Sequence, residues 1–130
     1  LGICYFMHEL CSVEMLLPED YARLFSAATG QNVDTQRMMW LGERIFNLEK
    51  CFNVLHTKWG REDDMPPRRF TSHPLDGRFK IDLEAWGQML DRYYELHGWD
   101  KATGKPLKET LQRLDLSAVQ RKLEQNGRLP

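Results

Sequence analysis

The stretch from Asp34 to His56 constrains the fold of this chain more than any other part of its sequence. Apolar residues recur in it at alternating steps of three and four, the spacing that places side chains on one face of an α-helix. They are Met38, Leu41, Ile45, Leu48, Phe52 and Leu55. The carboxylate of Asp34 can cap the first turn of such a helix. The spacing therefore predicts one long helix over about residues 35–56.

Apolar side chains also occur outside that stripe, so the predicted helix is apolar over most of its circumference. These residues are Met39, Trp40, Phe46, Cys51 and Val54. A helix of this kind is normally covered from several sides. We therefore expect it to be the central element of the core. The residues expected to be largely buried on it are Leu41, Ile45, Leu48 and Phe52.

A shorter helix is predicted from Pro18 to Thr29. Proline suits the first helical position, the acidic Glu19 and Asp20 complement the positive end of the helix dipole, and a glycine follows as a stop. The buried face of this helix is expected to consist of Tyr21, Leu24, Phe25 and Ala28.

Another helix is expected after Asp82, whose side chain can cap it, and it should run to about His97 and end at Gly98. Its aromatic stripe is more typical of a protein core than of a cofactor site. The stripe consists of Leu83, Trp86, Leu90, Tyr93, Tyr94 and His97.

Two short helices complete the pattern. One covers Pro106 to Leu114, and the other begins at a capping box of Ser117 and Gln120 and ends near Gly127. The sequence contains no internal repeat and no convincing strand. The predicted fold class is therefore all-α, an irregular helical domain arranged around the long helix at 35–56.

Residues 57–80 interrupt the helical pattern with prolines, glycines and interleaved charges. A connection of this length is usually functional or is wrapped on a partner surface. The simplest interpretation of its charges is a set of solvated surface ion pairs, which stabilise a fold very little.

The bulk composition bounds the class of protein. A chain of 130 residues is large enough for one core, so residues 1–130 are expected to form a single domain. Its 18 basic and 19 acidic residues give no nucleic-acid signature, and no apolar run is long enough to cross a membrane. Three cysteines cannot all pair, which favours a cytoplasmic protein with reduced thiols. Because the chain starts at Leu1 inside an apolar phrase, we expect it to be a fragment of a larger protein.

The cysteines are the chemically most informative residues. If residues 4–11 are helical, Cys4, His8 and Cys11 lie on one face and could contact one metal ion. The alternative is that these thiols are simply buried and the histidine is an ordinary polar group. A zinc site usually draws its ligands from two separate elements, which favours the alternative. Cys51 lies in the middle of the long predicted helix, so it is expected to be a buried and inert thiol.

Several phrases, in this order and spacing, resemble one family over essentially the whole chain. They are Leu1-Gly2-Ile3-Cys4, the stretch from Pro18 to Gly30, Gly42 to Lys50, Arg61 to Arg68, and Leu90 to Asp100. Together they resemble the C-terminal helical region of the tungsten-containing aldehyde ferredoxin oxidoreductase family.

This resemblance implies an oxidoreductase that converts aldehydes to carboxylic acids and passes electrons to ferredoxin. The family holds tungsten, sometimes molybdenum, on two pterins beside a [4Fe-4S] cluster. Three cluster cysteines belong to a part of the family that this chain does not contain. The fourth belongs to a phrase that ends as Gly2-Ile3-Cys4 does. The resemblance therefore implies that Cys4 is a cluster ligand and that Ile3 borders the pterin site through its backbone. No role is implied for Cys11.

The implied partners are the remaining domains of the same enzyme, ferredoxin and a small aldehyde. With one cluster ligand of four, the isolated chain is expected to hold neither cofactor and to be inactive. Two other functions stay open on the sequence. One is a free-standing helical protein-interaction module without redox activity, and the other is a small metal-binding module that uses Cys4, His8 and Cys11.

Overall fold

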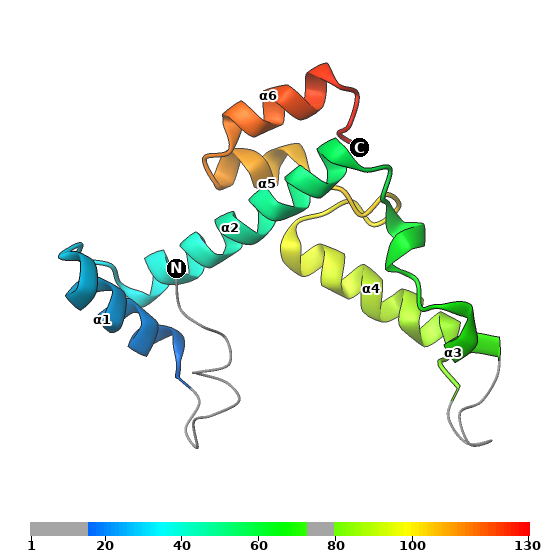
Figure 1. The fold of residues 1–130 in the computed structure, drawn as a ribbon, viewed down its shortest axis with the longest axis horizontal. Coiled ribbons are helices and arrows are strands. Elements are labelled where there is room, and N and C mark those ends of the chain that lie inside the picture. The colour runs from blue at the N-terminus through cyan, green and yellow to red at the C-terminus, as the bar shows by residue number, and fades with distance from the viewer. Residues whose placement is uncertain (1–15, 73–79) are drawn as a thin grey trace. The chain divides into compact units, whose positions relative to one another are not determined.

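The computed structural model of the chain describes residues 16–72 and 80–130. In this described part an isolated bridge pair, Trp99 with Pro106, is the only β-type contact. The helices follow one another as α1 (Pro18–Thr29), α2 (Thr35–His56), the 3-10 helix η2 (Arg61–Asp64), α3 (Arg68–Ser72), α4 (Leu83–His97), α5 (Lys108–Arg113) and α6 (Ser117–Gln125) (Figure 1). The predicted all-α class is confirmed. No helix in the described ranges is both long enough and apolar enough to span a membrane.

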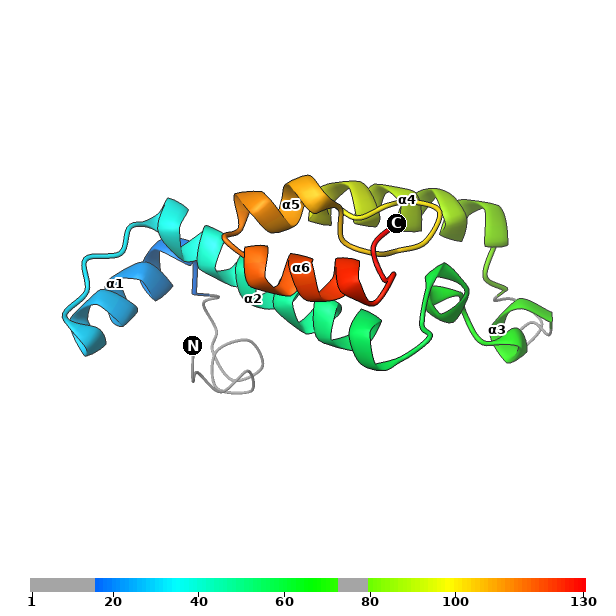
Figure 2. The ribbon, with the colours of Figure 1, turned by 90° about the horizontal axis from the view of Figure 1, so that it is seen from above.

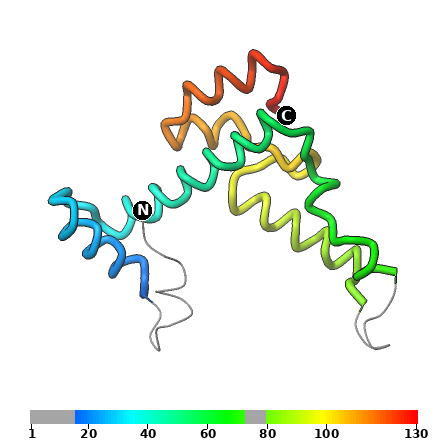
Figure 3. Tube along the Cα trace, viewed as in Figure 1, coloured from blue at the N-terminus to red at the C-terminus, as the bar shows by residue number. Residues whose placement is uncertain are grey.

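The chain divides into two compact units, residues 1–43 and 44–130, and α2 runs across the boundary between them. With 22 residues α2 is the longest of the described helices, as predicted, and the tube in Figure 3 follows it without interruption. Asp34 caps it, because its Oδ1 accepts a hydrogen bond of 2.7 Å from the backbone N–H of Arg37. The central position of this helix in a single domain stays a prediction.

Within the first unit, α1 begins at Pro18 and ends before Gly30, as the sequence predicts. The hydroxyl of Ser26 fixes the connection that follows, since it accepts from the backbone N–H of Val33 at 3.0 Å and donates to its carbonyl at 3.1 Å. The predicted buried face of this helix is only partly correct. Tyr21 and Phe25 are partly buried, whereas Leu24 is 52% exposed and Ala28 is also exposed. The buried residue of the helix is Ala22, which the prediction did not include.

The second unit contains the larger set of buried side chains. Many come from α4, from the turn after it, from α5 and α6, and from the turn between those two helices: Leu90, Tyr94, Trp99, Leu111, Leu114, Leu116 and Leu123. The helices α5 and α6 pack side by side, as Figures 1 and 2 both show. The two short helices thus pack against each other directly after the tight connection between them.

The capping of the second unit agrees with the sequence at α4 and differs at α6. Oδ1 of Asp82 accepts from the backbone N–H of Glu84 at 2.8 Å, and Gly98 ends the helix. At α6 the predicted capping box is wrong, because Leu116 occupies the cap position and Ser117 is already helical. The side chain of Gln120 donates instead to Glu124 at 2.9 Å.

The prediction for the buried face of α2 is also wrong in the second unit. Ile45, Leu48 and Phe52 are 41%, 44% and 63% exposed, and Leu41 in the first unit is only partly buried. The side chains that are buried along this part of the helix are Asn47, Cys51 and Val54. The sequence shows correctly that α2 is apolar on several sides, but it cannot show which of them this chain covers.

Candidate functional site

The residues to which the sequence assigns chemistry lie at the start of the chain. Ile3, Cys4, His8 and Cys11 all fall outside the described residues. Within the described residues, no group of three or more His, Cys, Asp or Glu side chains is arranged to hold a metal ion. The described residues alone therefore do not fit a metal centre, and the assignments of Ile3 and Cys4 stay predictions.

Cys51 is the cysteine that the structure describes, and it behaves as predicted. Its side chain is 1% exposed, and burial raises the pKa of its thiol to about 11. The thiol therefore stays protonated near neutral pH, and the protonated form is neither a good nucleophile nor a metal ligand. Cys51 is a packing residue of the α2 face that the second unit buries.

A polar cluster joins α2, η2 and α4, and we call it the Asp64 cluster: Asn47, Lys50, Asp64, Tyr94 and Trp99. The hydroxyl of Tyr94 donates to Oδ2 of Asp64 at 2.5 Å, and Nζ of Lys50 lies 3.6 Å from the same oxygen. The ammonium of Lys50 also lies 4.5 Å from the ring centroid of Trp99. The indole N–H of Trp99 donates to Oδ1 of Asn47 at 2.8 Å.

Electrostatics in the Asp64 cluster favour a structural role over acid–base chemistry. Tyr94 is fully buried, and burial raises the pKa of its hydroxyl far above the ordinary value, with the hydrogen bond to Asp64 adding to the effect. Burial also raises the pKa of the neighbouring Tyr93. Both hydroxyls therefore stay protonated near neutral pH, and Tyr94 acts as a fixed hydrogen-bond donor.

Arg61 ties residues 57–67 to the same region. Its Nη1 lies 2.7 Å from Oδ1 of Asp91 and donates to the carbonyl of Lys101 at 2.7 Å, while Nη2 donates to the carbonyl of Gly87 at 3.2 Å. The side chain is 24% exposed. The interpretation of these charges as solvated surface pairs is therefore wrong for Arg61, which holds η2 against α4.

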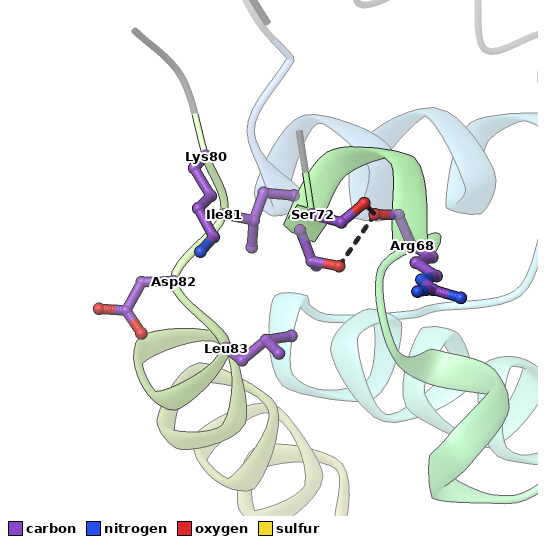
Figure 4. Close-up of a pocket in the computed structure, with 7 residues that line it drawn as sticks. Arg68, Ser72, Lys80, Ile81, Asp82 and Leu83 are labelled. Atoms are coloured by element: carbon purple, nitrogen blue, oxygen red, sulfur yellow. Dashed lines mark hydrogen bonds between the residues drawn. The ribbon is translucent and has the colours of Figure 1, made fainter. Parts of the chain in front are cut away.

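A shallow open pocket of about 440 Å³ lies where α3 meets the start of α4. The side chains of Ile81 and Leu83 are directed toward α3, and that of Asp82 is directed away from it (Figure 4). The hydroxyls that face this pocket are engaged locally, because those of Thr71 and Ser72 both donate to the carbonyl of Arg68. These two hydroxyls are therefore already satisfied within α3, and the charged side chains that also line the pocket are Arg68, Lys80 and Asp82.

A second open pocket, of about 490 Å³, lies on the exposed side of α2 and is lined by Leu48, Glu49, Phe52 and Asn53. Sequence reasoning missed this surface because it assigned the same apolar stripe to the core. The available signal was the breadth of the apolar arc on α2, which exceeds what one neighbour can cover.

Comparison with known proteins decides the family. The model of the family described as aldehyde ferredoxin oxidoreductase, domains 2 & 3, matches residues 1–116. The chain belongs to the aldehyde ferredoxin oxidoreductase family. The tungsten-containing aldehyde ferredoxin oxidoreductase of Pyrococcus furiosus is 37% identical to it over 100 residues, which cover 76% of this chain and 16% of that protein. The corresponding enzyme of Pyrococcus horikoshii is 34% identical over 99 residues, covering 75% of this chain and 16% of the enzyme.

The chain is also similar to part of a solved structure of another enzyme. The active-site complex BamBC of benzoyl coenzyme A reductase, solved with 1,5-dienoyl-CoA, matches with a TM-score of 0.72 and 28% identity. The match covers 86% of this chain and 16% of that chain. The chain thus spans about a sixth of the length of the relatives it matches.

Proposed function

We propose that this chain is the C-terminal domain of an aldehyde ferredoxin oxidoreductase-like enzyme that oxidises a small aldehyde to a carboxylic acid. The observation that carries the proposal is the family match over residues 1–116, to a model described as domains 2 & 3 of such enzymes. The named relatives contain tungsten, which supports a tungsten pterin, or its molybdenum counterpart, in the whole enzyme. The remaining domains of the enzyme, ferredoxin and the aldehyde are the proposed partners, in the cytoplasm.

Within this proposal Cys4 supplies one thiolate ligand to a [4Fe-4S] cluster, and the backbone of Ile3 forms part of one wall of the pterin site. Thiolate is the ordinary protein ligand for iron in such clusters. When bound, the metal pterin would supply the two-electron oxidation of the aldehyde, and the cluster would pass the electrons on. The described residues support this role as a scaffold, since the Asp64 cluster and Arg61 connect α2, η2 and α4 into one framework.

The second candidate is a free-standing helical interaction module without redox activity. The observation that favours it is the exposed apolar surface of Ile45, Leu48 and Phe52, which a binding module would use for a protein partner. The coding frame upstream of Leu1 separates the two. A continuous frame that carries a closely spaced set of three further cysteines supports the enzyme, and its absence supports the module.

The experiment for the enzyme compares Cys4→Ala with its matched control Cys11→Ala in the full-length enzyme. Tungsten, iron, the reduced-state EPR signal and aldehyde turnover are measured for each. Cys4→Ala should lose the wild-type cluster signal and most of the turnover, and Cys11→Ala should keep both. A wild-type EPR signal and turnover in Cys4→Ala would show that the ligand assignment is wrong. Purified full-length protein that takes up no tungsten and oxidises no aldehyde would contradict the enzyme itself.

A further inference from the structure

The second unit leaves one apolar face of α2 uncovered, and we call it the α2 outer face: Ile45, Leu48 and Phe52. Their exposed fractions are 41%, 44% and 63%. Isolated exposed apolar side chains are ordinary on protein surfaces. These three are different because steps of three and four residues place them next to one another on one side of a helix. They form a continuous apolar strip.

The strip and the buried residues of α2 lie on different sides of the helix. At about 100° per residue, the centre of the strip lies roughly 130° around the helix from the centre of Asn47, Cys51 and Val54. Those three residues are 0%, 1% and 3% exposed. A single neighbour that covers one of these faces therefore leaves the other uncovered. A second surface is needed to cover the α2 outer face.

The shape and charge of the strip describe what would fit it. The pocket of about 490 Å³ lined by Leu48, Glu49, Phe52 and Asn53 is open and shallow, so it suits a protruding side chain better than a small molecule. Its lining is apolar at Leu48 and Phe52, acidic at Glu49 and an amide at Asn53. This combination suits an apolar side chain that inserts between Leu48 and Phe52, with a basic group beside it to pair with Glu49.

We propose that the α2 outer face is the surface through which this domain docks on the other domains of its enzyme. The inference rests on the proposed function and names the partner of that function. Its occupant is an apolar side chain flanked by a lysine or arginine from the rest of the polypeptide. The chain spans only 16% of the length of the tungsten enzymes it matches, so most of an enzyme of that length is protein outside the described structure. That protein has ample surface to bury the strip.

Hydroxyl-radical footprinting of the full-length enzyme measures this burial directly. At 63% exposure, Phe52 should be labelled almost as fast as in the urea-unfolded enzyme if nothing covers it. Docking should slow its labelling at least tenfold. Equal labelling of Phe52 in the native and unfolded enzyme overturns the proposal.

Two variants of the full-length enzyme add a second readout. Phe52→Glu should lower the thermal midpoint and speed hydroxyl-radical labelling of Leu48, because a charge enters the interface. Phe52→Leu keeps the apolar contact and should restore both values to near wild type. Phe52→Glu that leaves both readouts unchanged contradicts the docking.

A second copy of this chain is the competing occupant. Sedimentation of the 130-residue chain distinguishes it. A dimer that Phe52→Glu dissociates would replace the proposed partner by a second copy, whereas a wild-type monomer supports the proposal.

Metal content and turnover of the full-length enzyme used for footprinting separate this inference from the proposed function. If the enzyme contains tungsten and turns over aldehyde but Phe52 is labelled as in the unfolded enzyme, only the docking is rejected. If Phe52 is protected but the enzyme contains no tungsten and shows no turnover, only the proposed function is rejected.

Discussion

The hydroxyl of Tyr94 donates a hydrogen bond of 2.5 Å to Oδ2 of Asp64, 30 residues earlier in the chain. This bond connects the last turn of α4 to the last residue of η2. Lys50 of α2 lies 3.6 Å from the same carboxylate oxygen. Three helical elements therefore meet at one carboxylate, and the irregular segment after α2 is positioned by that meeting.

Tyr94→Phe should lower the free energy of unfolding of the chain. The substitution keeps the buried ring but removes the donor to Asp64, and the loss of one hydrogen bond to a charged group costs about 1–3 kcal/mol. Asp64 is 38% exposed, so water can replace part of the lost bond and the lower end is expected. The measurement is urea unfolding followed by circular dichroism.

The matched control for Tyr94→Phe is Tyr93→Phe. The hydroxyl of Tyr93 makes no hydrogen bond with the described residues, and its side chain is 39% exposed. Its removal should change the free energy of unfolding by less than about 0.5 kcal/mol. Equal losses in the two variants would show that the Tyr94–Asp64 bond contributes nothing specific.

Gly104→Ala should destabilise the chain more than Gly127→Ala. Both glycines have positive φ, of 69° and 60°, so each alanine costs about 1–2 kcal/mol of backbone strain. A Cβ at Gly104 would also lie 2.7 Å from the hydroxyl oxygen of Tyr94, whereas a Cβ at Gly127 meets nothing within 4 Å. The steric clash should add about 1–3 kcal/mol. Thermal unfolding of the two variants measures the difference, and equal midpoints would contradict the packing of Tyr94 against Gly104.

The acidic limb of the pH–stability profile should depend on the turn at residues 100–105. The hydroxyl and backbone N–H of Thr103 donate to Oδ1 of Asp100 at 2.6 and 2.8 Å, and these bonds lower the pKa of Asp100 below its ordinary 3.8. Because the folded pKa is the lower one, this stabilisation is present above pH 3.8 and is lost as pH falls through the folded pKa. Thr103→Val should raise the pKa of Asp100 toward the ordinary value, as measured by its carboxyl NMR shift. Thr71→Val, which lies outside this turn, should leave that titration unchanged.

The sequence was sufficient for those features of the fold that depend on local chemistry. Pro18, Asp34 and Asp82 mark the starts of three helices because proline geometry and carboxylate caps act within one turn. The burial of Cys51 also agrees. The capping box at Ser117 failed because Leu116 already occupies the cap, a difference of one residue that composition does not determine.

The rest required knowledge of contacts between distant residues. From the sequence, Asp64 and Arg61 were interpreted as surface charges. Their partners, Tyr94 and Asp91, come 30 residues later in the chain, and local sequence does not reveal such contacts. Periodicity located the stripe of Ile45, Leu48 and Phe52 correctly on one face, but periodicity measures only apolarity. It does not report whether the covering surface belongs to this chain or to another domain. For the functional site, the family resemblance supplied Cys4 and Ile3, and these stay predictions.

Two aspartate substitutions on α2 separate the buried face from the outer face. Val54 is 3% exposed, so Val54→Asp places an unpaired charge in the packed side of the helix. It should cost several kcal/mol and unfold the isolated chain. Ile45 is 41% exposed, so the carboxylate that Ile45→Asp introduces can remain in water. This substitution should lower the free energy of unfolding by no more than about 1 kcal/mol.

Circular dichroism melts of the two variants of the isolated chain measure this contrast. A cooperative melt near the wild-type midpoint is expected for Ile45→Asp, and loss of the cooperative transition for Val54→Asp. The same Ile45→Asp change in the full-length enzyme should cost more than in the isolated chain, because there the α2 outer face would be covered. If Ile45→Asp unfolds the isolated chain as Val54→Asp does, the stripe is buried within the chain itself. The two substitutions thus decide which face of α2 this chain covers.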